Sequence, residues 1–160
     1  MNEAGEHKKF MEIAIRLSEK NVLEGIGGPF GAVVVKNGKV VAKSANKVTS
    51  TNDPTAHAEV SAIRLACKKL KTFDLSGCTI YTSCEPCPMC LSAIYWAKID
   101  IIYYGNTKVD AAAIGFNDKF IYDELDKPMH KRVLPVRQIL RAEAQRAFEL
   151  WGQSDMRIDY

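Results

Sequence analysis

Two short motifs constrain this chain more than any other feature: His57-Ala58-Glu59 and, further along, Pro86-Cys87-Pro88-Met89-Cys90. Together they offer one imidazole, two thiols and one carboxylate. A closed structural zinc site usually takes four protein ligands, whereas three ligands leave a fourth position for a water, whose pKa the metal lowers to about 7. Glu59 is then available to carry the proton of that water. The motifs therefore predict a catalytic zinc site with three ligands: His57, Cys87 and Cys90.

Both motifs stand where helices are expected to begin. Asp53-Pro54 predicts a helix over residues 55–70, because an aspartate caps free N–H groups and a proline fits the first helical turn. The first motif would then lie in that first turn. Two prolines in the second motif indicate another helix start, and the spacing of its thiols puts both on one helix face. Because helix N-termini lower the pKa of cysteine, these positions favour the thiolates that bind metal.

Each motif also has a simpler interpretation. His57 alone could cap a helix or lie at the surface, and the two thiols alone could form a redox pair in a thioredoxin-like domain. Neither interpretation explains Glu59, so a zinc site is the better hypothesis. The other cysteines match no ligand spacing and are expected to be small buried hydrophobic residues: Cys67, Cys78 and Cys84.

Length and composition agree with a compact enzyme. At 160 residues, 47% hydrophobic and 26% charged, the chain is long enough for a core and short for two domains, which predicts a single domain over residues 1–160. The 22 basic and 19 acidic residues are scattered, so the net charge of +3 neither suggests nor excludes nucleic acid. Residues 1–5 show no charged, apolar leader, and no apolar run reaches membrane-spanning length, so a cytoplasmic protein is expected.

The order of elements predicts an α/β domain. Phe10, Ala14 and Leu17 give a first helix its apolar stripe, and Gly25 ends it. Asn37-Gly38 is a strong hairpin signal between two strand-like runs. The expected strands are 32–36, 39–45, 78–83 and 99–105, and the expected later helices are 109–114, 119–125 and 138–151, around an irregular stretch at 127–135. This order indicates a three-layer arrangement with a mixed sheet, antiparallel at the hairpin and parallel where helices cross over.

Three stretches resemble the cytidine deaminase superfamily and, within it, bacterial guanine deaminases: residues 28–33 (GPFGAV), 52–59 (NDPTAHAE) and 83–90 (SCEPCPMC). The combination H-x-E with P-C-x-x-C is the known pattern of zinc nucleobase deaminases. The resemblance covers nearly the whole chain, including Gly115-Phe116-Asn117-Asp118. It implies a three-layer α/β/α domain with a mixed five-stranded sheet, one zinc per chain and a homodimer. It also implies a C-terminal segment, about residues 138–160, that is exchanged between subunits.

Three positions bear on the substrate. Phe30 alone is more simply a core residue, but its ring could stack on a flat base, and the resemblance favours stacking because tRNA adenosine deaminases tend to have a small aliphatic residue there. Asn46 ends a strand, and its amide can read a base edge, as the resemblance to guanine deaminases implies. The backbone N–H of Ala58, at a helix start, could bind a carbonyl oxygen of the base.

Two further positions depend mainly on the resemblance. Asp118 could simply cap the helix that begins near Lys119, but the resemblance implies that it contacts the amino group and helps it to depart. Asn117 stands where relatives can carry a second aspartate. Tyr160 ends the chain, where fraying is the usual expectation, whereas a guanine deaminase-like terminus closes over an active site.

The reaction that the resemblance implies is hydrolytic removal of the amino group at C2 of guanine, which gives xanthine and ammonia, with Glu59 as the acid–base group. Its substrate is then a free purine rather than a nucleic acid. Three alternatives stay open: a tRNA adenosine deaminase, a deaminase of guanosine, cytosine or an aminotriazine, and a non-catalytic zinc module. Phe30 and the scattered basic residues disfavour the first alternative, and the retained Glu59 disfavours the last.

Overall fold

The structure is a computed structural model that describes residues 3–160. Two compact units divide the chain, one that extends to Lys119 and one that covers Phe120–Tyr160. Each unit is described by itself. Among the described helices, none combines the length and the apolar character that a membrane-spanning helix needs.

A four-stranded mixed sheet forms the centre of the first unit. Its strands are β1 (Gly31–Lys36), β2 (Lys39–Ala45), β3 (Cys78–Cys84) and β4 (Ile101–Asn106), in the order β2-β1-β3-β4. β1 is antiparallel to both β2 and β3, and β3 is parallel to β4. The expected hairpin turns at Asn37 and Gly38, both with positive φ. The α/β class and the mixed sheet are therefore confirmed.

The expected fifth strand is wrong, since the described residues form a sheet of four strands. After β4 the chain passes into α5 (Lys108–Ala113) and α6 (Lys119–Leu125), and no strand follows. The later connection contains Pro128 and Pro135, which have no N–H group to give to a sheet. β4 thus remains an edge strand, and most of its residues are exposed.

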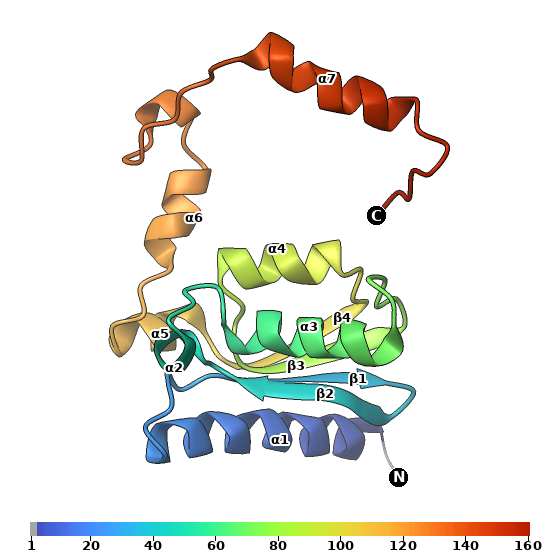
Figure 1. Cartoon of the computed structure of the whole chain (residues 1–160). Helices are drawn as coiled ribbons and strands as arrows, with labels where there is room; N and C mark the ends of the chain where they lie inside the picture. Colours follow the sequence, from blue (N-terminus) through green and yellow to red (C-terminus); the bar gives the residue numbers. More distant parts are fainter. Residues whose placement is uncertain (1–2) are drawn as a thin grey trace. The chain divides into compact units, whose positions relative to one another are not determined.

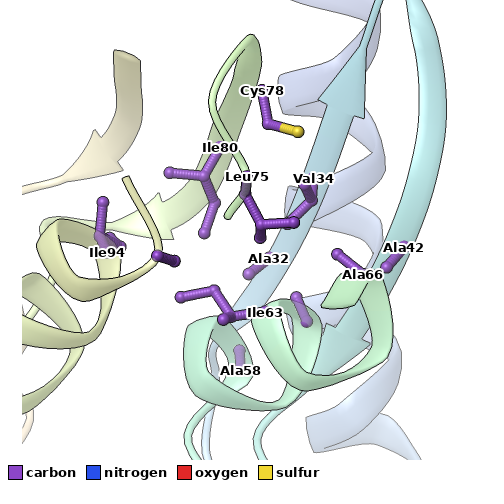
Figure 2. Packing of buried hydrophobic residues seen from close by; sticks show 12 residues of the cluster. Ala32, Val34, Ala42, Ala58, Ile63, Ala66, Leu75, Cys78, Ile80 and Ile94 are labelled. Atoms are coloured by element: carbon purple, nitrogen blue, oxygen red, sulfur yellow. The ribbon is translucent and has the colours of Figure 1, made fainter. Parts of the chain in front are cut away.

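Helices cover both faces of this sheet (Figure 1). α1 (Glu3–Leu23) lies on one face, and α3 (Ala58–Leu70) and α4 (Pro88–Trp96) lie on the other. Alternation along the strands divides the core accordingly, because successive side chains point to opposite faces. The cluster on the α1 side contains Phe10, Ala14, Val33, Val35 and Tyr81. On the other side, small residues of α3 such as Ala58 and Ala66 pack beside β-strand residues such as Val34 and Ile80 (Figure 2).

Gly31 allows α1 to approach β1 closely. A Cβ atom at this position would collide with the carbonyl oxygen of Ala14, and Leu17 Cβ would lie only 2.8 Å away. The first neighbour is a backbone atom of α1, and the second is the first side-chain atom of a residue in α1. Neither can move aside easily. Residue 31 therefore has to be glycine for α1 to pack this closely against β1. Phe30 is the residue directly before it.

The second unit consists of helices without a core of their own. Besides most of α6 it contains a short 3-10 helix, η1 (Met129–Lys131), and α7 (Arg141–Gly152). Every residue of Phe120–Tyr160 is described, and none is buried. α7 begins three residues later than the expected 138, because Leu140 has φ of +50° and ends the irregular stretch outside the helical conformation.

Candidate metal and catalytic site

The three predicted metal ligands come together at the first turns of two helices. His57 immediately precedes α3, Cys87 immediately precedes α4, and Cys90 lies in the first turn of α4. Their ligand atoms all lie within 4.8 Å of one another. His57 Nδ1 is 3.6 Å from Cys87 Sγ and 3.5 Å from Cys90 Sγ. Two ligands of a tetrahedral zinc, at bond lengths of about 2.05 and 2.3 Å, are expected to be about 3.6 Å apart. The ligand set therefore fits zinc.

The start of α3 differs from the expected one. The helix begins at Ala58, not at Thr55, because Asp53 forms a turn of its own. Its Oδ1 accepts hydrogen bonds from the Thr55 N–H at 2.8 Å and from the Thr55 hydroxyl at 2.7 Å. His57 therefore occupies the N-cap position in an extended conformation, as Cys87 does for α4. The two motifs thus enter their helices with the same geometry.

The two thiols differ in their affinity for a proton. Hydrogen bonds from Cys90 and then from His57 lower the pKa of Cys87 to about 4. The hydrogen bond between the thiols, together with burial, raises the pKa of Cys90. The hydrogen bond to Cys87 also raises the pKa of His57. Cys87 therefore loses its proton more readily than Cys90 does, and a metal has to compete with protons for these ligands.

Glu59 lies beside the ligands without being one of them. It is in the first turn of α3 and only 5% exposed. Its Oε2 accepts a hydrogen bond from Cys90 Sγ at 3.4 Å, and its Oε1 accepts one from the Thr82 hydroxyl at 3.3 Å. Burial is the main cause that raises its pKa. A buried carboxyl group with a raised pKa next to a metal site is suited to accept and return a proton.

Asp118 has a buried side-chain oxygen, Oδ1, without a hydrogen-bond partner. Among the described residues it is the one buried side-chain oxygen of this kind. Burial, followed by the nearby charge of Cys87, raises its pKa. Because buried polar atoms are nearly always paired in folded proteins, an unpaired acceptor indicates a place where a ligand could donate. The expectation that Asp118 belongs to the site is compatible with this geometry.

Two aromatic rings meet near the start of β1. The rings of Phe30 and Phe116 lie edge to face, with centroids 4.9 Å apart and planes at 87°. A Cβ atom at Gly28 would touch both rings, at 3.3 Å and 3.4 Å. Phe30 also packs against the core cluster of α3 and β1. We named Phe116 only as part of a motif. Its ring fixes the orientation of the Phe30 ring, which we predicted to stack on a base.

Asn46 directly follows β2, and Ala58 is the first residue of α3. The Asn46 side chain is 5% exposed, and its Oδ1 accepts a hydrogen bond from the Val48 N–H at 3.1 Å. That bond belongs to a short helix, α2 (Val48–Thr51), which we did not predict. Tyr160 lies in the second unit and is 71% exposed.

Sequence reasoning missed Asn21, which supports this part of the site. Its Nδ2 group donates to the Gly28 carbonyl at 2.8 Å and to the Asn46 carbonyl at 2.9 Å. The side chain is 3% exposed. An amide at a buried position of an amphipathic helix was the available signal, because a buried polar group needs partners. Asn21 thus joins the turn before Phe30 to the end of β2.

Comparisons with known proteins agree with this geometry. The family model of the cytidine and deoxycytidylate deaminase zinc-binding region matches residues 4–106. Guanine deaminase of Bacillus subtilis is 52% identical over 96% of this chain and 99% of its own length. The X-ray structure of guanine deaminase from Bacillus subtilis superposes with a TM-score of 0.94 at 48% identity, over 100% of this chain and 99% of that chain. The tRNA-specific adenosine deaminase of Agrobacterium fabrum is 39% identical over 72% of this chain and 75% of its own length.

Proposed function

Because the chain belongs to the cytidine and deoxycytidylate deaminase family, we propose that it removes the amino group of guanine by zinc-dependent hydrolysis, giving xanthine and ammonia. The observation that carries this proposal is the extent of the similarity to a guanine deaminase, which runs through both units of the chain. The similarity to the tRNA-specific enzyme covers 72% of the chain. The substrate is thus a free purine base.

The residues of the site supply the steps of this reaction. His57, Cys87 and Cys90 would hold the zinc, which when bound would supply a water of lowered pKa. Glu59 accepts a proton from that water and returns it to the ring nitrogen beside C2 of the base. The water oxygen adds to C2, and the hydroxyl group so formed gives up its remaining proton, through Glu59 or Asp118, to the amino group, so that a C2 carbonyl forms and the amino group leaves as ammonia. The unpaired Oδ1 of Asp118 supports a contact with that amino group.

The remaining site residues orient the base. Phe30 stacks on its ring system, and the edge-to-face contact with Phe116 holds the stacking ring in place. The amide of Asn46 and the backbone N–H of Ala58 bind the polar edges of the base. These contacts hold C2 near the metal site, which lowers the entropic part of the barrier.

The substrate class is tested by ammonia release from guanine, guanosine, cytosine, an aminotriazine and a tRNA anticodon stem-loop. We expect guanine to give the highest kcat/KM, and Phe30→Val to raise the KM for guanine about five- to hundredfold, since stacking contributes about 1–3 kcal/mol per base. Phe73→Val is the matched control, because Phe73 follows the far end of α3, about 20 Å along the helix from His57.

Phe73→Val should leave the kinetics unchanged. Deamination of the stem-loop by the unaltered protein, with none of guanine, would instead establish the tRNA adenosine deaminase. A preference for one of the other small compounds would keep the zinc chemistry and change the substrate. Equal KM values in Phe30→Val and the unaltered protein would remove the stacking role.

We also propose that the protein is a homodimer in which segment 138–160 of one subunit closes the active site of the other. The second unit has 41 residues from Phe120 to Tyr160, which is too short to form a stable core alone. It exposes large apolar side chains that need a covering surface, among them Ile139, Leu140, Phe148 and Trp151.

The free thiols of the chain fit a reducing compartment such as the cytoplasm.

Removal of Asp159-Tyr160 tests the closing tail. The truncated protein should stay folded and retain its zinc, while kcat/KM for guanine falls at least about tenfold, or about 1.4 kcal/mol, because an aromatic ring no longer excludes water from the site. Tyr160→Phe is the control that keeps the ring and removes only the hydroxyl group.

Mixing experiments separate a closing tail from an exchanged one. Hybrid dimers of truncated chains and Glu59→Gln chains should regain part of the activity, because one of their sites has an intact Glu59 and a tail from the partner. Unchanged kinetics after truncation would show that the tail has no role. A loss of activity that mixing does not restore would keep the closing tail and exclude its exchange between subunits.

A further inference from the structure

We propose that Thr82 positions the carboxylate of Glu59 for proton transfer. The proposal depends on the catalytic role proposed above for Glu59. Thr82 lies on β3, is 1% exposed, and approaches Glu59 Oε1 to 3.3 Å through its hydroxyl oxygen. No feature of the sequence motifs points to this residue, which lies five positions before Cys87.

The strand places the hydroxyl group on the face of the sheet that carries the site. Side chains alternate along β3, so Thr82 shares a face with Ile80, which belongs to the core cluster of α3 and α4. Tyr81, between them, belongs to the cluster on the α1 side. A hydroxyl group among such apolar neighbours destabilises the fold unless it is hydrogen-bonded.

The partners of the hydroxyl group satisfy this requirement. Its oxygen is 2.6 Å from the Cys84 carbonyl oxygen, to which it can donate, and 3.4 Å from the Cys84 N–H, from which it accepts. Glu59 Oε1 is the third partner. A hydroxyl group has one proton to donate and two lone pairs, and it rotates to suit its partners. Thr82 can therefore donate to the Glu59 carboxylate in one orientation and to the Cys84 carbonyl in another.

The contact with Oε1 suits both forms that Glu59 adopts during the reaction. While Glu59 is a carboxylate, Thr82 donates a hydrogen bond to Oε1. Once Glu59 has accepted a proton at Oε2, its Oε1 is still an acceptor, and Thr82 can keep this hydrogen bond. Oε1 is held in both forms, and Oε2 stays directed at the Cys90 side of the site. Without this contact Oε1 would lose a hydrogen bond, and the terminal torsion of the carboxyl group, which is broad for glutamate, would be less restricted.

The test compares Thr82→Val with Thr82→Ser. Valine keeps the branched shape and removes the hydroxyl group, whereas serine keeps the hydroxyl group. We expect Thr82→Val to lower kcat for guanine about ten- to hundredfold, as for the loss of a hydrogen bond to a charged group, with KM changed less than about twofold. Thr82→Ser should recover kcat to within about threefold. Thr79→Val, the same substitution on the other face of β3, is the matched control and should have normal kinetics.

Two measurements distinguish positioning of Glu59 from a structural effect of Thr82: the zinc content of Thr82→Val, and the effect of Thr82→Val in the Glu59→Gln variant. Thr82→Val should keep about one zinc per chain; loss of zinc would show that the hydroxyl group supports the strand end that leads to Cys87, and would overturn the proposal. Adding Thr82→Val to Glu59→Gln should cause no further loss of kcat, because the carboxylate is already absent. A full additional loss would also overturn the proposal.

Two outcomes distinguish this proposal from the role of Glu59. Normal turnover in Glu59→Gln would remove the catalytic role of Glu59 itself, and with it any positioning role. Normal turnover in Thr82→Val beside an inactive Glu59→Gln would remove only the role of Thr82. If Thr82→Val does not fold, Thr82→Ala against Thr82→Ser decides the question, since neither adds bulk: similar kcat values in the two would contradict the proposal.

Discussion

Glu59→Gln is expected to lower kcat for guanine by more than about ten-thousandfold while the protein keeps its fold and its zinc. General acid–base groups typically contribute a hundredfold to ten-thousandfold, and Glu59 is assigned more than one proton transfer. Glutamine has the same shape and can still accept the hydrogen bond from Thr82, but it cannot accept a proton and return it. The measurement is steady-state kinetics on protein whose zinc content has been determined.

Glu12→Gln is the matched control for this variant. It removes a carboxylate from α1, on the other face of the sheet, where Glu12 forms an exposed ion pair with Arg16. Because such pairs contribute little, turnover should be normal. Near-normal turnover in zinc-loaded Glu59→Gln would contradict the assigned role, and loss of zinc from that variant would make Glu59 a ligand.

Cys87→Ala and Cys90→Ala are expected to abolish zinc binding and, with it, deamination. Removing either thiol leaves two protein ligands, too few to retain the metal against dilution or a weak chelator. Metal analysis should find about one zinc per chain in the unaltered protein and less than about a tenth of that in either variant. Cys67→Ala, on α3 outside the ligand cluster, should keep its zinc. Full zinc content after both ligand cysteines are removed would contradict a zinc site at these residues.

The affinity for zinc should also fall toward acid pH. Hydrogen bonds to Cys87 raise the pKa values of Cys90 and His57, so protons compete with zinc for these two ligands. Lower pH favours the protonated ligands, so competition with a chelator at pH 6 should remove zinc more readily than at pH 8.

Local patterns were sufficient to predict most of the first unit. Asn37-Gly38 fixed the hairpin, and β2 spans the predicted residues. The ligand cluster was predictable because metal coordination selects both residue type and spacing. The start of α3 was predicted three residues early, because Asp53 could cap either the helix or a turn, and the sequence alone does not separate these roles.

Contacts between distant residues were not predictable in this way. The bond of Thr82 to Glu59 spans 23 residues, and that of Asn21 to Asn46 spans 25 residues, so neither leaves a periodic pattern. The five-stranded sheet was inferred from the resemblance and not from any strand-like run, and the structure has four strands. Residue types at single positions are weaker evidence than spacing, which is why the roles of Asp118 and Tyr160 stay predictions.

The hydrogen bonds of Asn21 have a consequence for the evolution of substrate preference. α1 lies on the opposite face of the sheet from the metal ligands. The side-chain amide of Asn21 on α1 nevertheless holds the carbonyl groups of Gly28 and Asn46. The close packing of α1 at Gly31 also fixes the chain next to Phe30. The shape of the proposed base-binding site at Phe30 and Asn46 is thus set from the other face of the sheet. Selectivity can therefore drift through changes in a helix that touches no substrate, while the chemistry of the zinc site is left intact. A search for variants that accept other bases would do well to include α1.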